Sequence, residues 1–216
     1  MQVRVVDAQG QPLQEPYLLR LPGWTLERYL QEAPENALWE FAYGEVIVHS
    51  PVSAEHQRIV GFLHRLIAGY CEAIGWGEVL LAPTALRVLP QVVREPDLFV
   101  LPPEEAGRAH GTPIDARPAL VVEVLSPSTR SLDLREKPDD YARARIPEYW
   151  AVDPEQKALL AHRLEGNAYR VEEVREGWLE SGAVPRLRLR VDWLWEQPLP
   201  PASRCLAELL TSGGPR

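Results

Sequence analysis

The chain has 216 residues, of which 45% are hydrophobic and 25% charged, a composition typical of one globular domain. Its 31 acidic residues outnumber its 23 basic ones, and the formal net charge of −8 excludes a uniformly basic surface for nucleic acid. No apolar run approaches the roughly 18 residues of a membrane span, and the start MQVRVVDAQGQ lacks a signal-peptide pattern. With only Cys71 and Cys205 and no disulfide framework, we expect a cytoplasmic protein without a membrane partner.

The N-terminal half predicts a short helix, a hairpin and one long helix. Residues 1–22 are expected to form an N-terminal extension that begins as an extended segment over residues 3–6. A helix is predicted over residues 24–33, where a threonine can cap the first turn. Residues 38–50 predict a hairpin that turns at a Tyr-Gly pair. The clearest helix begins at a serine and extends over residues 53–75, with apolar side chains at helical spacing.

The rest of the chain predicts mainly strands. In chain order we expect strands at 78–89, 97–101 and 119–125, a helix within 134–145, a strand at 148–152, two or three hairpins within 158–191 and a short helix at 203–210. This mixed order predicts one α/β domain over residues 23–197 with extra β-hairpins, followed by a helical tail over residues 198–216.

Two carboxylates carry the most information about chemistry. Glu123 interrupts the apolar strand 119–125, and a carboxylate inside a buried strand is costly unless it is paired or binds a cation. Asp97 follows Pro96 at the start of another strand, so the two carboxylates could meet at one sheet edge and hold a magnesium ion. The alternatives are a buried salt bridge from Glu123 to an arginine, and a turn aspartate at Asp97.

These residues and their neighbours resemble a known group of nucleases. Pro96-Asp97, followed by Glu123 in an apolar strand, resembles the PD-(D/E)XK nuclease superfamily, which includes many restriction endonucleases. The resemblance to the Uma-type family of restriction-endonuclease-like proteins is closer and covers roughly residues 24–195. The segments that carry it are Trp39–Glu45, Ser53–Gln57, Glu123–Thr129, Asp133, Lys137, Tyr141 and Pro147–Asp153.

The resemblance implies a three-layer α/β/α core with a mixed central sheet. It further implies a metal-dependent endonuclease that hydrolyses phosphodiester bonds of nucleic acid, with DNA favoured. Asp97 and Glu123 would bind Mg²⁺ or Mn²⁺, the backbone carbonyl of Val124 would be a third ligand, and Glu40 would add a ligand directly or through water. By analogy with enzymes that cut both strands of a duplex, a homodimer is expected.

The sequence departs from the superfamily pattern at its lysine. That lysine belongs two residues after Glu123, where this chain has Leu125, which cannot neutralise a phosphate or orient a water. The Uma-type pattern has a lysine at Lys137, which we expect to take this catalytic role, with Tyr141 one helical turn further as a substrate contact. Pro138 restricts Lys137 to the start of its helix. A solvated surface lysine is the alternative.

Three further polar residues are expected to contact substrate. His56 and Gln57 lie at the start of the long helix, and Ser126 directly follows the strand of Glu123. His56 would otherwise be a surface residue of the first turn, and Ser126 only the end of the strand. The sequence contains no G-x-S-x-G elbow and no Walker loop. The second candidate function is a non-catalytic member of the same fold that binds nucleic acid or a protein, which the acidic charge and the missing strand lysine favour.

Overall fold

The computed structural model describes residues 11, 16–34 and 38–212. The predicted extended segment over residues 3–6 lies outside the described residues. No helix in the described part of the chain is both long and apolar enough to cross a membrane.

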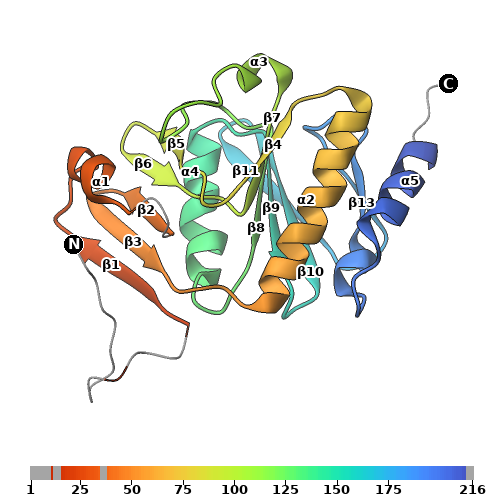
Figure 1. Ribbon diagram of the computed structural model, residues 1–216, viewed down its shortest axis with the longest axis horizontal. Coiled ribbons are helices and arrows are strands. Elements are labelled where there is room, and N and C mark those ends of the chain that lie inside the picture. The colour runs from red at the N-terminus through yellow and green to blue at the C-terminus, as the bar shows by residue number, and fades with distance from the viewer. Residues whose placement is uncertain (1–10, 12–15, 35–37, 213–216) are drawn as a thin grey trace.

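A six-stranded mixed sheet forms the centre of the molecule (Figure 1). One of its two central strands, β8, runs parallel to β9 on one side and antiparallel to β7 on the other. This arrangement places the carboxyl end of β8 beside the start of β7. In spatial order the strands are β11 (Ala168–Val174), β10 (Ala158–Glu165), β9 (Glu148–Asp153), β8 (Leu120–Val124), β7 (Leu98–Leu101) and β4 (Glu78–Leu81).

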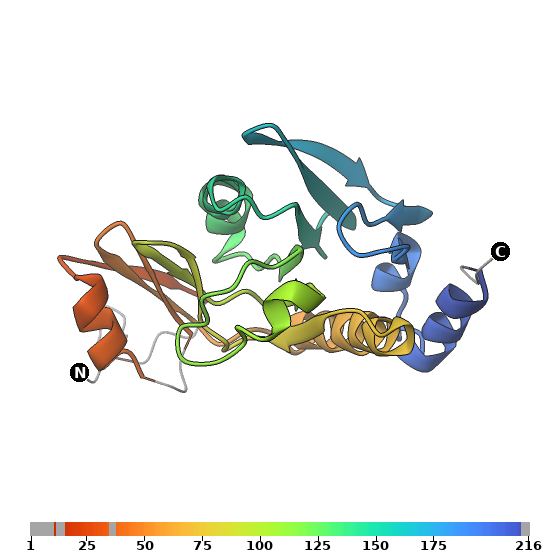
Figure 2. The same ribbon diagram turned by 90° about the horizontal axis from the view of Figure 1, so that it is seen from above.

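The long helix α2 (Ala54–Ile74) covers one face of this sheet. The hydroxyl of Ser53 caps its start by accepting a hydrogen bond from the His56 backbone N–H at 3.1 Å, as the sequence predicts. Its apolar side packs on β7, β8 and β9, and α5 (Ala202–Ser212) packs on α2 in turn. Figure 2 shows α2 and α4 on opposite faces of the sheet. The beginning of α2 therefore lies at the end of the sheet where β8 finishes.

The other face is covered by α4 (Lys137–Arg143) and by a second sheet. A single π-helical turn, Leu132–Glu136, leads directly into α4. The strands of the second sheet, in spatial order, are β1 (Leu18–Pro22), β3 (Glu45–His49), β2 (Trp39–Ala42), β6 (Val92–Arg94) and β5 (Leu86–Leu89). The expected three-layer α/β/α core with a mixed central sheet and extra hairpins is thereby confirmed.

The remaining elements are short. One extra hairpin is β10–β11 in the central sheet, and another is a separate two-stranded pair. These minor elements are α1 (Leu26–Glu32), α3 (Pro103–Ala106), β12 (Trp178–Glu180), β13 (Arg188–Arg190) and a 3-10 turn (Val191–Trp195).

One predicted strand, residues 78–89, is wrong. The chain instead forms β4 and β5, which belong to different sheets, with a turn in which the Thr84 N–H donates to the Leu81 carbonyl at 3.0 Å. Pro83 has no backbone N–H to give to a ladder, so strand pairing stops there. Strands β1 and β6 are absent from the sequence interpretation because segments of three to five residues carry little periodicity.

Two glycines end α2 and direct the chain into β4. Gly75 has φ +64° and Gly77 has φ +70°, both in the left-handed region. A Cβ at Gly77 would lie 2.4 Å from the backbone oxygen of Leu101, whereas at Gly75 it would meet no described heavy atom within 4 Å. Gly77 therefore sets how closely the end of α2 approaches β7.

We expect Gly77→Ala to destabilise the fold far more than Gly75→Ala. The strained φ alone should cost about 1 kcal/mol at Gly75, whereas the added clash with a backbone atom should bring the loss at Gly77 to about 3 kcal/mol. Urea unfolding of both variants measures the difference. Equal losses would mean that the approach of Gly77 to Leu101 does not constrain the fold.

Candidate active site

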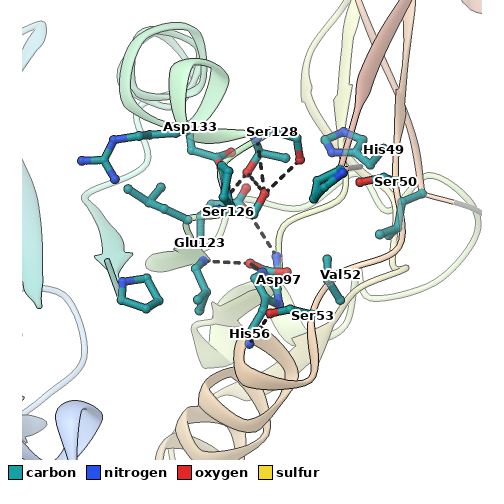
Figure 3. Close-up of a pocket in the computed structure, with 18 of the residues that line it drawn as sticks. His49, Ser50, Val52, Ser53, His56, Asp97, Glu123, Ser126, Ser128 and Asp133 are labelled. Carbon is teal, nitrogen blue, oxygen red and sulfur yellow. Dashed lines mark hydrogen bonds and ion pairs between the residues drawn. The ribbon is translucent and has the colours of Figure 1, made fainter. Parts of the chain in front are cut away.

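A cavity of about 330 Å³ opens where the end of β8 meets the start of α2 and the edge of the second sheet (Figure 3). Its walls carry many more carboxylates than cationic groups. The acidic lining residues are Glu40, Glu55, Glu95, Asp97, Glu123, Asp133, Asp153 and Glu155, and the lysine and arginine lining residues are Arg130 and Lys137. The cavity is therefore strongly acidic.

Asp97 and Glu123 converge at this cavity from neighbouring antiparallel strands. The Asp97 backbone N–H donates to Glu123 Oε2 at 3.3 Å, and the Val124 N–H donates to Asp97 Oδ2 at 2.8 Å. Each carboxylate is thus oriented by the backbone of the other strand. Two residues 26 positions apart meet because β7 and β8 pair in this register.

Lys137 is buried, with 2% of its surface exposed, so it is not a solvated surface lysine. Its Nζ lies 2.6 Å from Glu123 Oε1, 3.0 Å from Asp133 Oδ1 and 3.1 Å from Glu40 Oε1. Glu123 consequently forms its buried ion pair with a lysine and not with an arginine. Leu125, where the superfamily has its lysine, is buried in the apolar core.

The local helix geometry brings this lysine to the site. Lys137 donates its backbone N–H to the carbonyl of Leu132, which closes the π-helical turn. Asp133 and Lys137, four residues apart, then approach the same cavity. Pro138 falls in the first turn of α4, where proline is tolerated because the first helical N–H groups have no partner within the helix.

The excess of buried carboxylates controls the electrostatics. Burial raises the pKa of Glu123 well above its usual range; Lys137 opposes this shift, while the negative charges of Asp133, Asp97 and Glu40 add to it. Burial alone would lower the pKa of Lys137, but Asp133, Glu123 and Glu40 raise it well above its ordinary value. Lys137 therefore stays protonated, and it can donate hydrogen bonds but cannot accept a proton.

A second buried cation supports Glu40. Arg94 is fully buried and donates from Nη1 to Glu40 Oε2 at 2.9 Å and from Nη2 to Asp140 Oδ2 at 2.6 Å. Burial opposes the charge of Glu40, yet Lys137 and Arg94 hold its pKa well below the ordinary value. Charges thus alternate in sign along Asp140, Arg94, Glu40, Lys137 and Glu123. The sequence analysis assigned no role to Arg94 or Asp140. The only signal was an arginine directly after two valines and before the Glu-Pro-Asp segment.

Glu95 adds a further buried carboxyl group to the cavity wall. Burial, and secondly the charge of Glu40, raise the pKa of Glu95 to about 8. Its Oε2 is buried and has no hydrogen-bond partner among the described residues. At neutral pH Glu95 is therefore mostly protonated, and it becomes an anion only when a nearby positive charge lowers its pKa.

His56 lies inside the cavity and not on the surface of α2. Its Nε2 is 3.2 Å from Asp97 Oδ2, and its buried Nδ1 has no partner in the described structure. Burial lowers the pKa of His56, but the hydrogen bond and charge of Asp97, with a further bond to the Val124 backbone, raise it overall. His56 therefore fixes the orientation of Asp97.

The other three residues that were expected to contact substrate lie in different surroundings from one another. Gln57 is exposed and does not line the cavity, because adjacent helical residues point about 100° apart and His56 points inward. Tyr141 is fully buried behind the site and donates its hydroxyl to Glu123 Oε1 at 2.9 Å, so it supports the carboxylate and does not reach substrate. Ser126 lines the cavity but bonds to Ser128 and Thr129 and not to Glu123.

The donor set fits a hard divalent cation. No three His, Cys, Asp or Glu side chains in the described ranges form a ready metal-binding group. The expected set needs only Asp97, Glu123 and the Val124 backbone, all of which line the cavity. Carboxylate and carbonyl oxygens suit Mg²⁺ or Mn²⁺, and the buried Glu95 Oε2 is a further oxygen at the cavity without a hydrogen-bond partner among the described residues.

Helices on both faces of a mixed sheet, with an aspartate and a glutamate meeting between two of its strands, define the restriction-endonuclease-like class of nuclease folds. The family model Uma2, described as "Putative restriction endonuclease", matches residues 26–192. The chain therefore belongs to this family, as the sequence resemblance predicts.

A solved structure supports the same fold. The chain is similar to a protein from Anabaena variabilis ATCC 29413 described as a putative nuclease belonging to DUF820, with a TM-score of 0.67 and 15% sequence identity. The similarity covers 79% of this chain and 97% of that one. No curated protein matches the sequence.

We expect Lys137→Met to destabilise the protein by about 3 to 5 kcal/mol at pH 8, because three buried carboxylates lose their shared cation. Without it the pKa of Glu123, which burial already raises well above its ordinary value, rises further, so the folded state binds more protons than the unfolded chain and the loss shrinks as the pH falls towards about 5. Urea unfolding at both pH values measures this. The control is Lys157→Met, at the exposed second lysine, and a pH-independent loss would contradict the prediction.

Proposed function

We propose that this protein is a metal-dependent endonuclease that hydrolyses phosphodiester bonds of nucleic acid, with DNA as the favoured substrate. The observation that carries the proposal is the meeting of Asp97 and Glu123 at one cavity, with the ammonium of Lys137 2.6 Å from Glu123. Two acidic ligands beside a protonated lysine match the chemical needs of phosphate ester hydrolysis. Membership of the Uma2 family supports the same reaction class.

Asp97, Glu123 and the backbone carbonyl of Val124 would hold Mg²⁺ or Mn²⁺, which when bound would polarise the phosphate and acidify a water. His56 holds Asp97 in position, and Tyr141 holds Glu123. Lys137, kept protonated by its carboxylate neighbours, stabilises negative charge that develops on the phosphate.

Glu40 is better assigned as a positioning residue than as a metal ligand. Its Oε1 contacts Lys137 and accepts the Glu95 N–H, and its Oε2 accepts from Arg94. Both oxygens are therefore engaged by cations or N–H donors. Glu40 in this role fixes the lysine against Glu123.

The second candidate is a non-catalytic member of the fold that binds nucleic acid or a protein. One observation favours it: Glu123 Oε1 already accepts hydrogen bonds from both Lys137 and Tyr141, which leaves fewer lone pairs for a metal. Metal titration separates the two candidates, since a purely binding protein needs no cation at this carboxylate.

Asp97→Asn and Glu123→Gln are each expected to reduce DNA cleavage at least about a hundredfold, because one metal ligand is lost. Isothermal titration with MgCl₂ or MnCl₂ should show binding to the wild type and weak or no binding to either variant. Asp115→Asn, which changes an exposed carboxylate outside the cavity, is the matched control and should cleave normally. A wild type that binds no metal and is as inert as Glu123→Gln would refute the endonuclease proposal.

We further propose that the protein acts in the cytoplasm as a homodimer, because two-fold symmetry gives one site to each strand of a duplex. Sedimentation in the presence of a DNA duplex should then give a mass for the protein component of two chains. A single-chain mass at all protein concentrations would contradict the dimer without affecting the chemistry of the site.

A further inference from the structure

Arg130 is the accessible cation at the mouth of the cavity. The other cationic side chain among the described lining residues, apart from the histidines, is Lys137, which three carboxylates already surround. The Arg130 side chain keeps 35% of its surface exposed. Arg130 can therefore meet an incoming anion before any deeper group does.

The guanidinium of Arg130 has donors to spare. Its Nη2 lies 2.5 Å from Asp153 Oδ2, while its Nη1 is 4.0 Å from Glu155 Oε2, beyond hydrogen-bond distance. A guanidinium carries five N–H donors, and the contact with Asp153 uses one side of the group. Asp153 is buried at the end of β9, so it anchors the arginine while most of its donors remain available.

Next to Arg130 lies a group of three hydroxyls, here called the hydroxyl loop: Ser126, Ser128 and Thr129. Ser126 Oγ is 3.2 Å from Ser128 Oγ and 2.9 Å from Thr129 Oγ1. Figure 3 shows the Ser126 and Ser128 side chains at the cavity, on the same side as Glu123 and Asp133. Ser126 Oγ also accepts from the Thr129 N–H, and Thr129 Oγ1 accepts from the Ser126 N–H, each at 3.3 Å. These bonds use acceptor positions, so the half-buried hydroxyls can rotate to donate to an external oxygen.

The charge around the mouth favours one point of entry for a phosphate. Glu55 and Glu155 are exposed carboxylates on the cavity rim and repel an anion. The hydroxyl loop and Arg130 supply the hydrogen-bond donors of the rim, with Glu155 Oε2 4.0 Å from Arg130 Nη1. In a protein of net charge −8, such a local contact is what a polyanion needs in order to dock.

We propose that Arg130 and the hydroxyl loop bind an internal phosphodiester of the nucleic-acid strand, next to the phosphate that is cleaved. This proposal rests on the proposed function and assigns a substrate-binding residue outside the metal site. A guanidinium and hydroxyl donors can contact two or three oxygens of one phosphate, which gives affinity and fixes the register of the strand. Arg130 retains Asp153 as its anchor, so the strand binds to a side chain that is already oriented.

The test is the affinity of a fluorescent 12-nucleotide DNA strand, measured by anisotropy in EDTA and again with MgCl₂. Arg130→Gln should weaken binding about tenfold, which corresponds to one lost charged contact, and should reduce the magnitude of the salt slope by about 0.7. Arg130→Lys should recover part of the affinity, since a lysine keeps the charge but not the planar group.

Arg135→Gln is the matched control, since Arg135 is exposed five residues away, has no ion pair in the described structure and does not line the cavity. It should bind within about twofold of the wild type. An Arg130→Gln affinity equal to that of Arg135→Gln would overturn the proposal. The melting temperature of each variant checks that folding is intact, because the buried Asp153 loses its cation in Arg130→Gln but keeps one in Arg130→Lys.

Two further measurements identify the ligand and separate the proposals. Strands with a 5′-phosphate or a 5′-hydroxyl should lose the same affinity in Arg130→Gln, and a loss confined to the 5′-phosphorylated strand would overturn binding of an internal phosphate. Magnesium affinity should be unchanged in Arg130→Gln, and a parallel loss of metal binding would assign Arg130 to the metal site instead. Failure of the wild type to bind metal would refute the proposed function, while the DNA affinities in EDTA would still test Arg130.

Discussion

The site depends on one buried ammonium group. The Nζ of Lys137 lies within 3.1 Å of carboxylate oxygens from Glu40, Glu123 and Asp133, which come from three separate segments of the chain. Without this cation, the folded protein would have to bury several like charges together, which is strongly unfavourable. Its presence therefore explains why carboxylates of the two sheets and of the π-helical turn can lie so close.

The position of this lysine bears on the departure from the superfamily pattern. A lysine on the strand would point from the same face as Glu123, where Leu125 instead joins the apolar core. In this chain the cation is Lys137, at the start of α4, which covers one face of the sheet. The π-helical turn that precedes α4 orients Lys137 towards Glu123. The ammonium thus reaches Glu123 from a residue 14 positions further along the chain, which a motif of fixed spacing does not predict.

Much of the fold could be predicted because its signals are local. The caps at Thr25 and Ser53, the apolar stripe of α2 and the apolar strand β8 are each readable within a few residues. The second sheet was not predicted, since β1 and β6 are short and their pairing with distant strands is a tertiary property. The prediction of one continuous strand through Pro83 was also wrong, because β4 and β5 belong to different sheets.

Some residues of the site could be predicted because they interrupt a local pattern in the sequence. Glu123 stands out in an apolar strand, and Asp97 follows a proline at the start of another. Arg94 could not be found this way, because its role comes from contacts with Glu40 and Asp140, 54 and 46 residues away. Likewise the inward direction of His56 and the outward direction of Gln57 depend on how α2 rotates over the sheet, which local spacing leaves open.

The second sheet has a consequence for the integrity of the site. It contributes Glu40 and Arg94, while Asp97 and Glu123 come from the central sheet and Asp133 and Lys137 from the segment that crosses over it. The ionic cluster therefore takes residues from both sheets and from the segment that crosses over the central sheet. A fragment with the central sheet alone would keep Asp97 and Glu123 but would lack Arg94 and Lys137. The complete cluster can therefore form only after the two sheets have packed against each other during folding.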